Sequence, residues 1–549
     1  MELLKKVRHK VERACRHLLS EQNRDRYTPT YGCFDRRYWG WKLVDYPEAT
    51  FQRNVYPLAW LLGQAEQHSI GTASTLQEAV VAGLGFAVNI QHKDGSFDQA
   101  FPNERSFGAT AFLLHPLLAG YRVVQEVMTP SQRAACERCL RQGANFLCRH
   151  DETHGHIANH LAGAVFSLLT CAEFFDESRY ERRAEFLLQR ILNHQSNEGW
   201  FLEYEGADPG YQTLCIHYLA QVYQMKPDER LLKALTKAVN FLSWFVNPDG
   251  TFAGEYGSRR TAVYYPGGLA LLQSIPMALS ITQHMVWSIA EENTVTIDDV
   301  DVGNVAPLLS SYILLLDTLK ANETNLNLAV PPLPWQEENA CQDFAEAGLY
   351  VRSSKRYYAV TGASNGGVLK IFDRDQRRLL LDDGGYVGES EDGSKVTTQI
   401  TDLKRKCLAT HKHIQIEVPF YRMPQTVLTP AQFVLLRILN LTIMHSVWLG
   451  NQVKALLVRR LISGKRRVPL NLVRTLIFER EHVVIQDQLT IQSQFSLRWL
   501  ECGRPFVAIH MASSRYFQGF SVSDQRGQPH TVDVLSLKTR GIVQSQITV

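Results

Sequence analysis

EGWFLEYEGADPGYQTLCIHYLA, residues 198–220, is the stretch of this sequence around which the rest is organised. It begins with Gly199 beside two aromatic residues, continues through an acidic loop broken by glycine and proline at 203–210, and ends in apolar residues at helical spacing. Glycine and proline mark turns, and this spacing indicates a helix. Tyr211 and Gln212 are therefore expected in the first turn of that helix. Helical hairpins that bring polar and aromatic loop ends into a shared cleft are well suited to bind a sugar.

Turns of the same kind recur through the first 320 residues, between apolar runs at helical spacing. The copies are DGSF at 94–97, EGWF at 198–201 and DGTF at 249–252, with HGH at 154–156 as a degenerate copy. Their glycines, at positions 95, 155, 199 and 250, are 60, 44 and 51 residues apart, which leaves room for two helices and two loops per repeat. Repeats of this length indicate an α/α array, either an open solenoid or a closed toroid.

The pattern changes in the second part of the chain. Residues 321–345 lose the helical periodicity and carry three prolines, which predicts a linker. From 346 to 549, short alternating runs are separated by glycine and aspartate turns. Those runs predict the strands and hairpins of an antiparallel β-sandwich.

One segment of this second part, residues 429–464, has helical spacing instead. It lies in the span between Glu417 and Glu479, which holds nine lysines and arginines and no acidic residue. A basic, apolar helical insert can bind an anionic polymer, or can lie on an anionic membrane through 429–474. The alternative is a helix that packs on the sandwich and leaves its basic flank in solvent.

The totals fit an ordinary globular protein of more than one domain. Its 549 residues are 45% hydrophobic and 21% charged, and this length exceeds what one core supports. The formal net charge of +3 is small for the length and argues against a nucleic-acid partner. We find no secretory signal and no run of about 18 uncharged apolar residues. A cytoplasmic protein, at most peripheral to a membrane, is therefore expected.

The ten cysteines are scattered along the chain, which is typical of free thiols in a reducing compartment. Cys136 and Cys139 form a CxxC motif, but it lies in a helical pattern and has no second pair. We expect them to be two thiols on a helix surface. Neither a metal nor a cofactor is predicted.

Three segments resemble the heparinase II/III-like family of polysaccharide lyases and uronyl epimerases. Asn159-His160-Leu161 is similar to a helix start of that family. Residues 198–214 are similar to the family's segment that carries its catalytic tyrosine, which falls on Tyr211. Residues 362–387 are similar to the strand pair that opens the family's sandwich. The resemblance implies an α+β multidomain chain, with an incomplete (α/α) toroid at 1–320 and an antiparallel β-sandwich with a helical insert at 346–549. It also implies action on an acidic polysaccharide or oligosaccharide.

The same resemblance implies a site that removes the proton at C5 of a uronic acid, the step that lyases and epimerases share. Asn159 would neutralise the carboxylate, Tyr211 would act as base or acid once a nearby cation lowers its pKa, and His160 or His156 would carry a second proton. Six further residues are expected at the substrate: His156, Glu203, Gln212, Arg259, Arg260 and Tyr264. The two arginines suit a carboxylate clamp. Together with the basic residues of 454–474 they are expected to form a basic groove between the two halves.

Each of these residues also has a structural interpretation. Asn159 suits a helix N-cap, Tyr211 suits a half-buried position in a core, and Arg259 suits a salt bridge. The spacing favours a site, because Tyr211 follows Asn159 by 52 residues, about one repeat. In a toroid this places both residues on one rim, on neighbouring hairpins.

The sequence departs from the family at two points. Gln212 stands where the family has a histidine after the tyrosine, and Ala363 and Asn365 stand near the expected positions of the sandwich histidines. A single-step epimerase and a polysaccharide-binding protein without activity are therefore alternatives to a lyase.

Carboxylates raise a further alternative, a glycoside hydrolase, because α/α toroids also host enzymes that work with paired acids. The candidates are Asp94, Glu203, Glu205, Asp208 and Asp249. A third interpretation, a triterpene cyclase, rests on a resemblance of 91–97 and 195–200 to QW repeats. It ranks last, because no DxDD motif is present and the β-rich second half does not suit that family.

Overall fold

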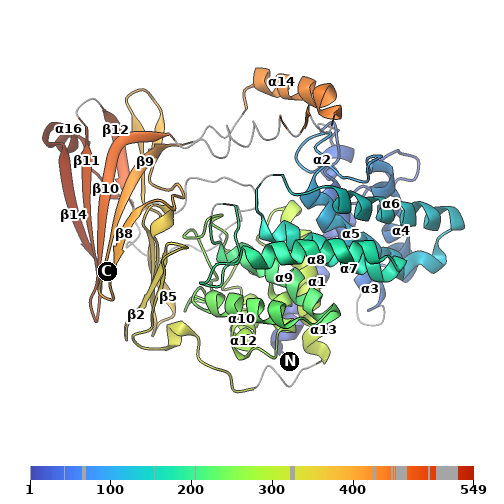
Figure 1. Ribbon diagram of the computed structural model, residues 1–549, viewed down its shortest axis with the longest axis horizontal. Helices are drawn as coiled ribbons and strands as arrows, with labels where there is room; N and C mark the ends of the chain where they lie inside the picture. Colours follow the sequence, from blue (N-terminus) through green and yellow to red (C-terminus); the bar gives the residue numbers. More distant parts are fainter. Residues whose placement is uncertain are drawn as a thin grey trace.

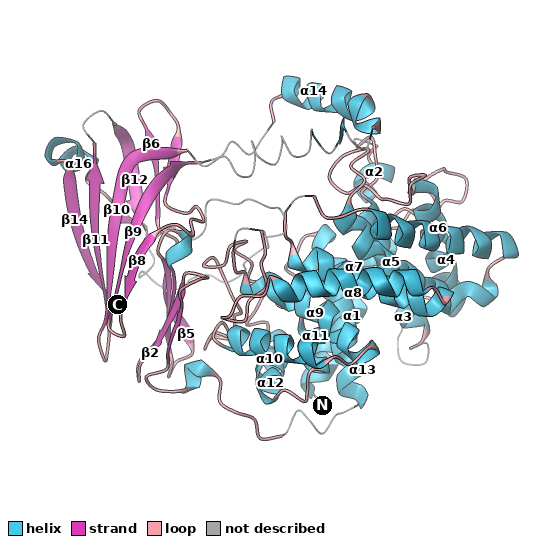
Figure 2. Ribbon diagram, in the orientation of Figure 1, coloured by secondary structure: helices cyan, strands magenta, loops and turns pink. Residues whose placement is uncertain are grey.

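The computed structural model divides into a helical part and a β part (Figures 1 and 2). It describes residues 2–42, 44–64, 70–153, 155–204, 206–321, 328–423, 428–446, 449–450, 452, 466–492, 495–502 and 530–549. Helices α1 to α13 occupy the N-terminal part and antiparallel sheets the C-terminal part. The predicted order of a helical toroid followed by antiparallel β-sheets is confirmed.

The helices form two layers. Consecutive inner helices contact one another, and α13 also contacts α3, so the series returns towards its start. The inner helices are α3 (Val55–Leu62), α5 (Phe107–Val124), α7 (Ala158–Phe175), α9 (Pro209–Met225), α11 (Pro266–Leu271) and α13 (Val302–Ala321). The outer helices are α1 (Glu2–Glu21), α4 (Ala73–Ile90), α6 (Pro130–Arg149), α8 (Ser178–Asn193), α10 (Glu229–Ser243) and α12 (Pro276–Ala290). Outer helices such as α8 and α10 bury one apolar face, whereas inner helices such as α7 are apolar on most sides.

Four helices (α4, α5 with its 3₁₀ extension to residue 127, α7 and α13) are long and apolar enough to cross a membrane, by length and composition alone. In the structure, between 44% and 72% of each such window is buried inside the protein. Three of the four belong to the inner layer, where a helix has neighbours on most sides. A two-layered ring therefore accounts for their hydropathy.

The glycine turns found in the sequence follow outer helices and lead the chain back to the inner layer. Gly95, Gly199 and Gly250 have φ angles of 94°, 102° and 94°, which glycine adopts without strain. A Cβ atom at Gly95 would lie 2.1 Å from the main-chain oxygen of Gln142 in the next outer helix. The turn therefore fixes how closely successive hairpins pack. Residue 154 of the degenerate copy lies outside the described residues.

A five-stranded sheet lies between the toroid and a second sheet (Figure 1). Its strands, in spatial order, are β1 (Cys341–Phe344), β2 (Leu349–Ser353), β3 (Tyr357–Gly362), β4 (Val368–Asp373) and β5 (Arg378–Asp383). Successive side chains of a strand point to opposite faces. Leu349 and Val351 accordingly join the toroid core, whereas Tyr350 joins the core between the sheets. Both faces of this sheet are buried, so the toroid and the sandwich form one packed body.

The second sheet closes the sandwich. Its strands are β6 (Tyr386–Ser390), β7 (Lys395–Thr397), β8 (Lys406–Ala409), β9 (His413–Arg422), β10 (Arg467–Phe478), β11 (Val483–Ile491), β12 (Leu497–Cys502), β13 (His530–Thr531) and β14 (Ile542–Thr548). They pair in the order β13-β12-β6-β7-β9-β10-β11-β14, and β8 also pairs with β9. In β10, Leu470 and Leu472 are buried and Asn471 is exposed. Only the inner face of this sheet therefore packs against the rest of the protein.

Between β9 and β10 the chain leaves the second sheet and reaches the toroid (Figure 1). Helix α14 (Pro430–Leu441) and the 3₁₀ turn Ile443–His445 lie within the predicted insert, while its residues 447–448, 451 and 453–464 lie outside the described residues. The main-chain oxygen of Asn440 accepts a 3.1 Å hydrogen bond from Asn103, and Arg437 pairs with Asp45 at 2.9 Å. This helix therefore packs on loops of the toroid, and not on the sandwich.

Candidate active site

The rim at which the inner helices begin brings together residues that the sequence singled out. Asn159 is the second residue of α7, and its Nδ2 donates a 2.7 Å hydrogen bond to Oε2 of Glu203. An antiparallel bridge between Ile157 and Glu203 holds the loop 203–208 against the start of α7. Asn159 and Glu203 are 2% and 4% exposed, so this amide–carboxyl pair is shielded from bulk water.

The carboxyl group of Glu203 titrates near neutrality. Burial raises its pKa to about 7, against the opposing effects of Arg259, His160 and the hydrogen bond from Asn159. Its Oε1 has no hydrogen-bond partner among the described residues. The protonated form of the group can donate a hydrogen bond to an incoming anion.

One carboxyl group holds Tyr211 and Arg259 together. Asp208 caps α9, and its two oxygens accept hydrogen bonds from the main-chain N–H groups of Tyr211 (2.9 Å) and Arg259 (2.8 Å). A Cβ atom at Gly257 would lie 2.6 Å from this carboxyl, so the loop 254–262 approaches it only because residue 257 is glycine. The guanidinium carbon of Arg259 then lies 5.1 Å from the ring centroid of Tyr211. A cation in this position favours a phenolate.

Tyr204 belongs to the same group, although no sequence pattern indicated it. Its ring centroid lies 4.0 Å from the guanidinium carbon of Arg259. Its φ of 58° is a left-handed conformation, which costs a residue other than glycine about 1 kcal/mol or more and is concentrated at functional sites. Burial raises the pKa of the Tyr204 phenol, and Arg259 opposes this effect. We call Asn159, Glu203, Tyr204, Tyr211 and Arg259 the rim cluster.

His160 lies beside the rim cluster and has a partner of its own. Its Nδ1 is 2.6 Å from Oε2 of the buried Glu152, and its ring meets Phe112 edge-on with centroids 5.2 Å apart. A Cβ atom at Gly108 would lie 2.6 Å from the His160 ring, so α5 and α7 pack closely here. The carboxylate fixes the orientation of the imidazole. His160 is thereby held beside the rim cluster, close to Glu203.

The first sheet braces the loop that carries Arg259. Asn365 donates hydrogen bonds to the main-chain oxygens of Glu255 (2.7 Å) and Gly257 (2.6 Å), and its Oδ1 accepts one from Thr401 (2.6 Å). Asn365 is fully buried. Near this position the resemblance implies a sandwich histidine. In this protein Asn365 stands there, and its hydrogen bonds join the first sheet to the toroid.

Replacing Asn365 with alanine is expected to destabilise the protein by about 2 kcal/mol, because two buried carbonyl groups lose their donor. The loop 254–262 should then exchange its amide hydrogens faster. Thermal unfolding and hydrogen exchange of the Asn365→Ala variant measure the two effects. Asn193→Ala, at the exposed end of α8, is the matched control. Equal unfolding free energies for the two variants would contradict the bracing role.

Gln212 and Tyr264, both predicted at the substrate, have structural partners. The side-chain amide of Gln212 accepts from the N–H of Phe201 and donates to the main-chain oxygen of Ala238, both at 3.1 Å. Tyr264 is buried in the toroid core, where its ring centroid lies 5.0 Å from that of Phe252. The structure therefore does not bring these two residues into the rim cluster.

Arg260 and His156 lie in the walls around the cluster. Arg260 donates to the main-chain oxygen of Gln399, and burial lowers its pKa to about 10. His156 stacks on His194 with ring centroids 4.2 Å apart, and burial lowers its pKa to about 4, with a smaller effect of His194. At neutral pH His156 is uncharged. Both side chains thus support the site from outside the rim cluster.

Arg474 was expected to line a basic groove between the two halves, and this prediction is wrong. This residue is 0% exposed in β10 and pairs with Asp383 (2.9 Å) and Asp487 (2.7 Å) inside the sandwich. The alternation of β10 turns residue 474 inward, where two carboxylates compensate its charge. Arg467, at the start of the same strand, pairs with Asp402 at 3.0 Å. The basic residues of 454–465 lie outside the described residues.

Of the carboxylates that suggested a hydrolase, Glu203 belongs to the rim cluster, and the other described ones have local structural partners. Asp94 accepts a hydrogen bond from Ser96 and pairs with Arg105, and Asp249 accepts one from Thr251. Asp208 caps α9, and Glu205 lies outside the described residues. The described residues therefore do not favour a pair of catalytic carboxylates.

The cysteines, all of them among the described residues, form no disulfide bond in the structure. All ten cysteines are free thiols. Cys136 and Cys139 are buried and not on a helix surface, because the face of α6 that they share packs against the toroid. Among the residues that the structure describes, no group of three or more His, Cys, Asp and Glu side chains is arranged to hold a metal ion.

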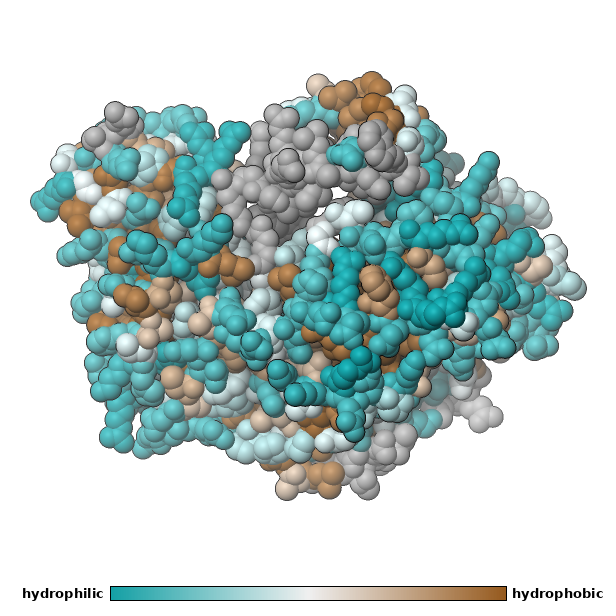
Figure 3. Space-filling view, in the orientation of Figure 1, coloured by the Kyte–Doolittle hydropathy of each residue, from teal (hydrophilic) through white to brown (hydrophobic). Residues whose placement is uncertain are grey.

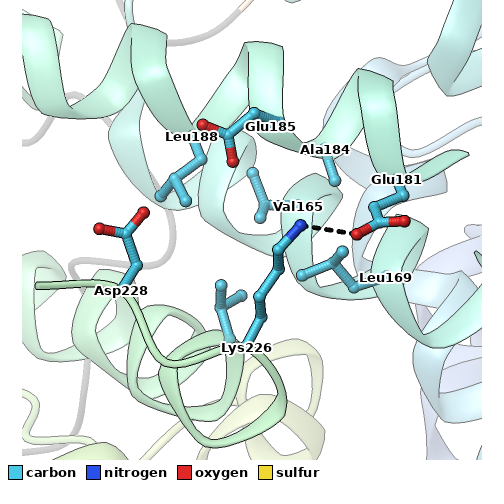
Figure 4. Close-up of a pocket in the computed structure, with 9 residues that line it drawn as sticks. Val165, Leu169, Glu181, Ala184, Glu185, Leu188, Lys226 and Asp228 are labelled. Carbon is cyan, nitrogen blue, oxygen red and sulfur yellow. Dashed lines mark hydrogen bonds and ion pairs between the residues drawn. The ribbon is translucent and has the colours of Figure 1, made fainter. Parts of the chain in front are cut away.

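A small cavity lies on the outer side of the toroid, between α8 and the end of α9 (Figure 4). Its volume is about 10 Å³, and Lys226 reaches across it to Glu181 at 2.6 Å. This space suits a water molecule and not a sugar. The rim cluster, at the opposite end of α9, therefore remains the candidate site.

One protein-family model matches a large part of the toroid. Residues 48–269 match the family model described as the ulvan lyase N-terminal domain. This range contains every member of the rim cluster. Among curated proteins, none matches the sequence.

Solved structures show the same architecture. The chondroitin AC lyase of Streptomyces coelicolor A3 in complex with chondroitin sulphate aligns with a TM-score of 0.54 and 11% identity, covering 91% of this chain and 67% of that chain. A mutant of the same lyase gives a TM-score of 0.51, with the same identity and coverage. The HepC heparan sulfate lyase mutant from Pedobacter heparinus gives 0.42 at 9% identity, covering 90% of this chain and 70% of that chain. In the sequence of residues 48–269 this chain is thus similar to the ulvan lyase N-terminal domain, and in its fold it is similar to the Streptomyces coelicolor A3 chondroitin AC lyase.

Proposed function

We propose that the protein is a polysaccharide lyase that acts on an acidic, uronic-acid-containing polymer at the rim cluster. The observation that carries this proposal is the buried Asn159–Glu203 pair, with a carboxyl pKa of about 7, next to Tyr211 and Arg259. A neutral carboxylic acid and an amide suit the carboxylate of a uronate. A phenol beside a guanidinium suits the proton transfer.

The chemistry begins with the proton at C5, which is weakly acidic while the adjacent carboxylate keeps its charge. Hydrogen bonds from Asn159 and from protonated Glu203 would stabilise the charge that develops on that carboxylate. The Tyr211 phenolate takes the C5 proton. The electron pair forms the C4–C5 double bond as the bond from C4 to the leaving oxygen breaks, and Tyr211 returns the proton to that oxygen. The phenolate is thereby restored at the end of the cycle.

Product analysis tests the proposal. Ulvan, chondroitin sulphate and heparan sulfate, which the similar proteins carry in their names, are the first polymers to incubate with the protein. A lyase releases a 4,5-unsaturated uronate, detected by its ultraviolet absorbance. An epimerase would place solvent deuterium at C5 without cleaving the chain, and a hydrolase would create new reducing ends with neither signal. Either of these last two results, in place of the unsaturated product, would overturn the lyase assignment.

We further propose a cytoplasmic role in polysaccharide biosynthesis or processing, at a membrane surface. The ten free thiols support a reducing compartment. Helix α14 supports the membrane contact, because five of its apolar side chains are exposed: Phe433, Val434, Leu435, Ile438 and Leu441. Figure 3 shows a hydrophobic patch at the position of α14. The sequence around this patch carries basic and no acidic residues, which complements the anionic lipids of a cytoplasmic leaflet.

Flotation with liposomes that contain anionic phospholipid tests this contact. The protein is expected to float at low salt, and a Leu435→Glu/Ile438→Glu variant should bind about tenfold less, because two apolar side chains leave the bilayer surface. Val123→Glu/Val127→Glu, at exposed apolar positions near the end of α5, is the matched control. Failure of the unaltered protein to float would disprove the membrane contact.

A further inference from the structure

We propose that Arg53, Tyr218 and Tyr265 form a second anion-binding subsite next to the rim cluster. Its ligand is the carboxylate or sulfate group of the sugar that adjoins the one at Tyr211. This inference rests on the proposed function, since both groups belong to one acidic polymer. It adds a requirement for acidic groups on neighbouring sugars of the substrate.

Arg53 supplies the positive charge. It lies near the end of the 3₁₀ helix Ala49–Asn54, directly before α3. Its Nε donates to the main-chain oxygen of Thr50 at 2.9 Å, and a terminal nitrogen donates to that of Gly303 at 3.3 Å. Among the described residues, no carboxylate lies within ion-pair distance of its guanidinium, and burial lowers its pKa. A desolvated cation held only by neutral oxygens gains most from an anionic ligand.

Two phenols supply hydrogen-bond donors. Tyr218 follows Tyr211 by two helical turns on α9, and Tyr265 directly precedes α11. Among the described residues no hydrogen bond is formed by either hydroxyl; Tyr265 is buried and Tyr218 is half-buried. Burial raises the pKa of Tyr218 to about 12 and raises that of Tyr265, so both phenols keep their protons at neutral pH.

The three side chains lie within electrostatic reach of one another and of the proposed base. The charge of Arg53 acts on both Tyr218 and Tyr265, and Tyr265 also interacts with Tyr211. The main-chain N–H of Tyr265 donates to the Thr213 hydroxyl at 3.0 Å, which fixes the start of α11 against α9. The subsite is therefore built on inner helices and not on a free loop.

Phe112 forms a wall that runs from the subsite to the rim cluster. Its ring stacks on Tyr218 with centroids 5.6 Å apart, and the guanidinium carbon of Arg53 lies 6.0 Å from its centroid. On the other side, the same ring meets His160 at 5.2 Å. An apolar wall with a few convergent polar groups is the usual composition of a ligand site. Here the wall can face a sugar ring while Arg53 takes its acidic group.

Equilibrium dialysis with labelled inorganic sulfate and with glucuronate, at fixed ionic strength, tests the subsite directly. The unaltered protein should bind one or both probes, and Arg53→Gln should weaken that binding about tenfold or more. Arg53→Lys should keep part of it, because the charge is retained and the planar donor fork is lost. Arg138→Gln removes the same charge from the exposed face of α6 and is the matched control. The more tightly bound probe identifies the acidic group.

The result separates this inference from the proposed function. Tyr211→Phe should bind the probes as well as the unaltered protein does, because the phenol of residue 211 is not part of the subsite. Binding that depends on Arg53, without cleavage of any polymer, would support the subsite and count against the lyase. If cleavage occurs, Arg53→Gln should raise KM about tenfold with little change in kcat. Equal probe binding by the unaltered protein and Arg53→Gln, or no binding by either, would overturn the subsite.

Discussion

Replacing Tyr211 with phenylalanine is expected to reduce the rate of release of the unsaturated product by about a thousandfold. This loss lies within the range of rate enhancement that a single general acid–base group contributes. The variant loses the oxygen that, in the proposed mechanism, takes the C5 proton and returns it to the leaving group. It keeps the ring that packs beside Arg259. Its fold and its affinity for the polymer should therefore change little, and the loss should appear in kcat.

Tyr264→Phe is the control, because it removes the same oxygen from a tyrosine of the toroid core. This variant should cleave the polymer at nearly the unaltered rate. Initial rates from ultraviolet absorbance, with polymer binding measured separately, give the comparison. Full activity of Tyr211→Phe would refute proton abstraction by residue 211 and would leave only the architecture in place.

The fold could be predicted because its signals are local and repeated. The glycine turns at 95, 199 and 250 recur after outer helices, as the sequence pattern indicated, and each glycine has a positive φ. The alternation of the second part likewise predicted antiparallel strands. The alternation did not show that the first sheet packs on the toroid. Leu349 and Tyr350 are both apolar and face two different cores, and alternation of polar and apolar residues does not reveal a strand that is buried on both faces.

The site could be predicted only in part, for a similar reason. Asn159 and Tyr211 mark helix starts one repeat apart, so their meeting at the rim follows from the helical array. Tyr204 depends on a left-handed backbone, which no periodicity signals. Asn365 meets the loop 254–262 only because two separate folding units dock. Arg474 was expected at the surface because it lies in a basic span of the sequence. It is instead buried, because it pairs with two carboxylates from other strands.

The pKa of Glu203 leads to a second large effect, on stability. The folded state holds this proton with a pKa of about 7, whereas the ordinary value is 4.5. Because the folded state binds the proton more tightly, the free energy of unfolding falls as pH rises from about 4.5 to about 7 and is level above that range. The difference corresponds to about 3 kcal/mol at most. Glu203→Gln removes this titration and should be more stable than the unaltered protein above pH 7.

Denaturant unfolding of Glu203→Gln between pH 4 and 9 measures how the free energy of unfolding changes with pH, and Glu229→Gln, on the exposed first turn of α10, is the control that should not alter this change.

Glu203→Gln also tests the chemistry. The protonated carboxyl donates to the substrate carboxylate, so activity limited by Glu203 falls as pH rises through about 7. A glutamine amide also donates, so Glu203→Gln should keep activity and lose this alkaline limb. Glu203→Ala should lose about a hundredfold, because the developing charge loses a donor. An unfolding slope in Glu203→Gln equal to that of the unaltered protein would mean that another group titrates, and Glu203 could not serve as the acid of the site.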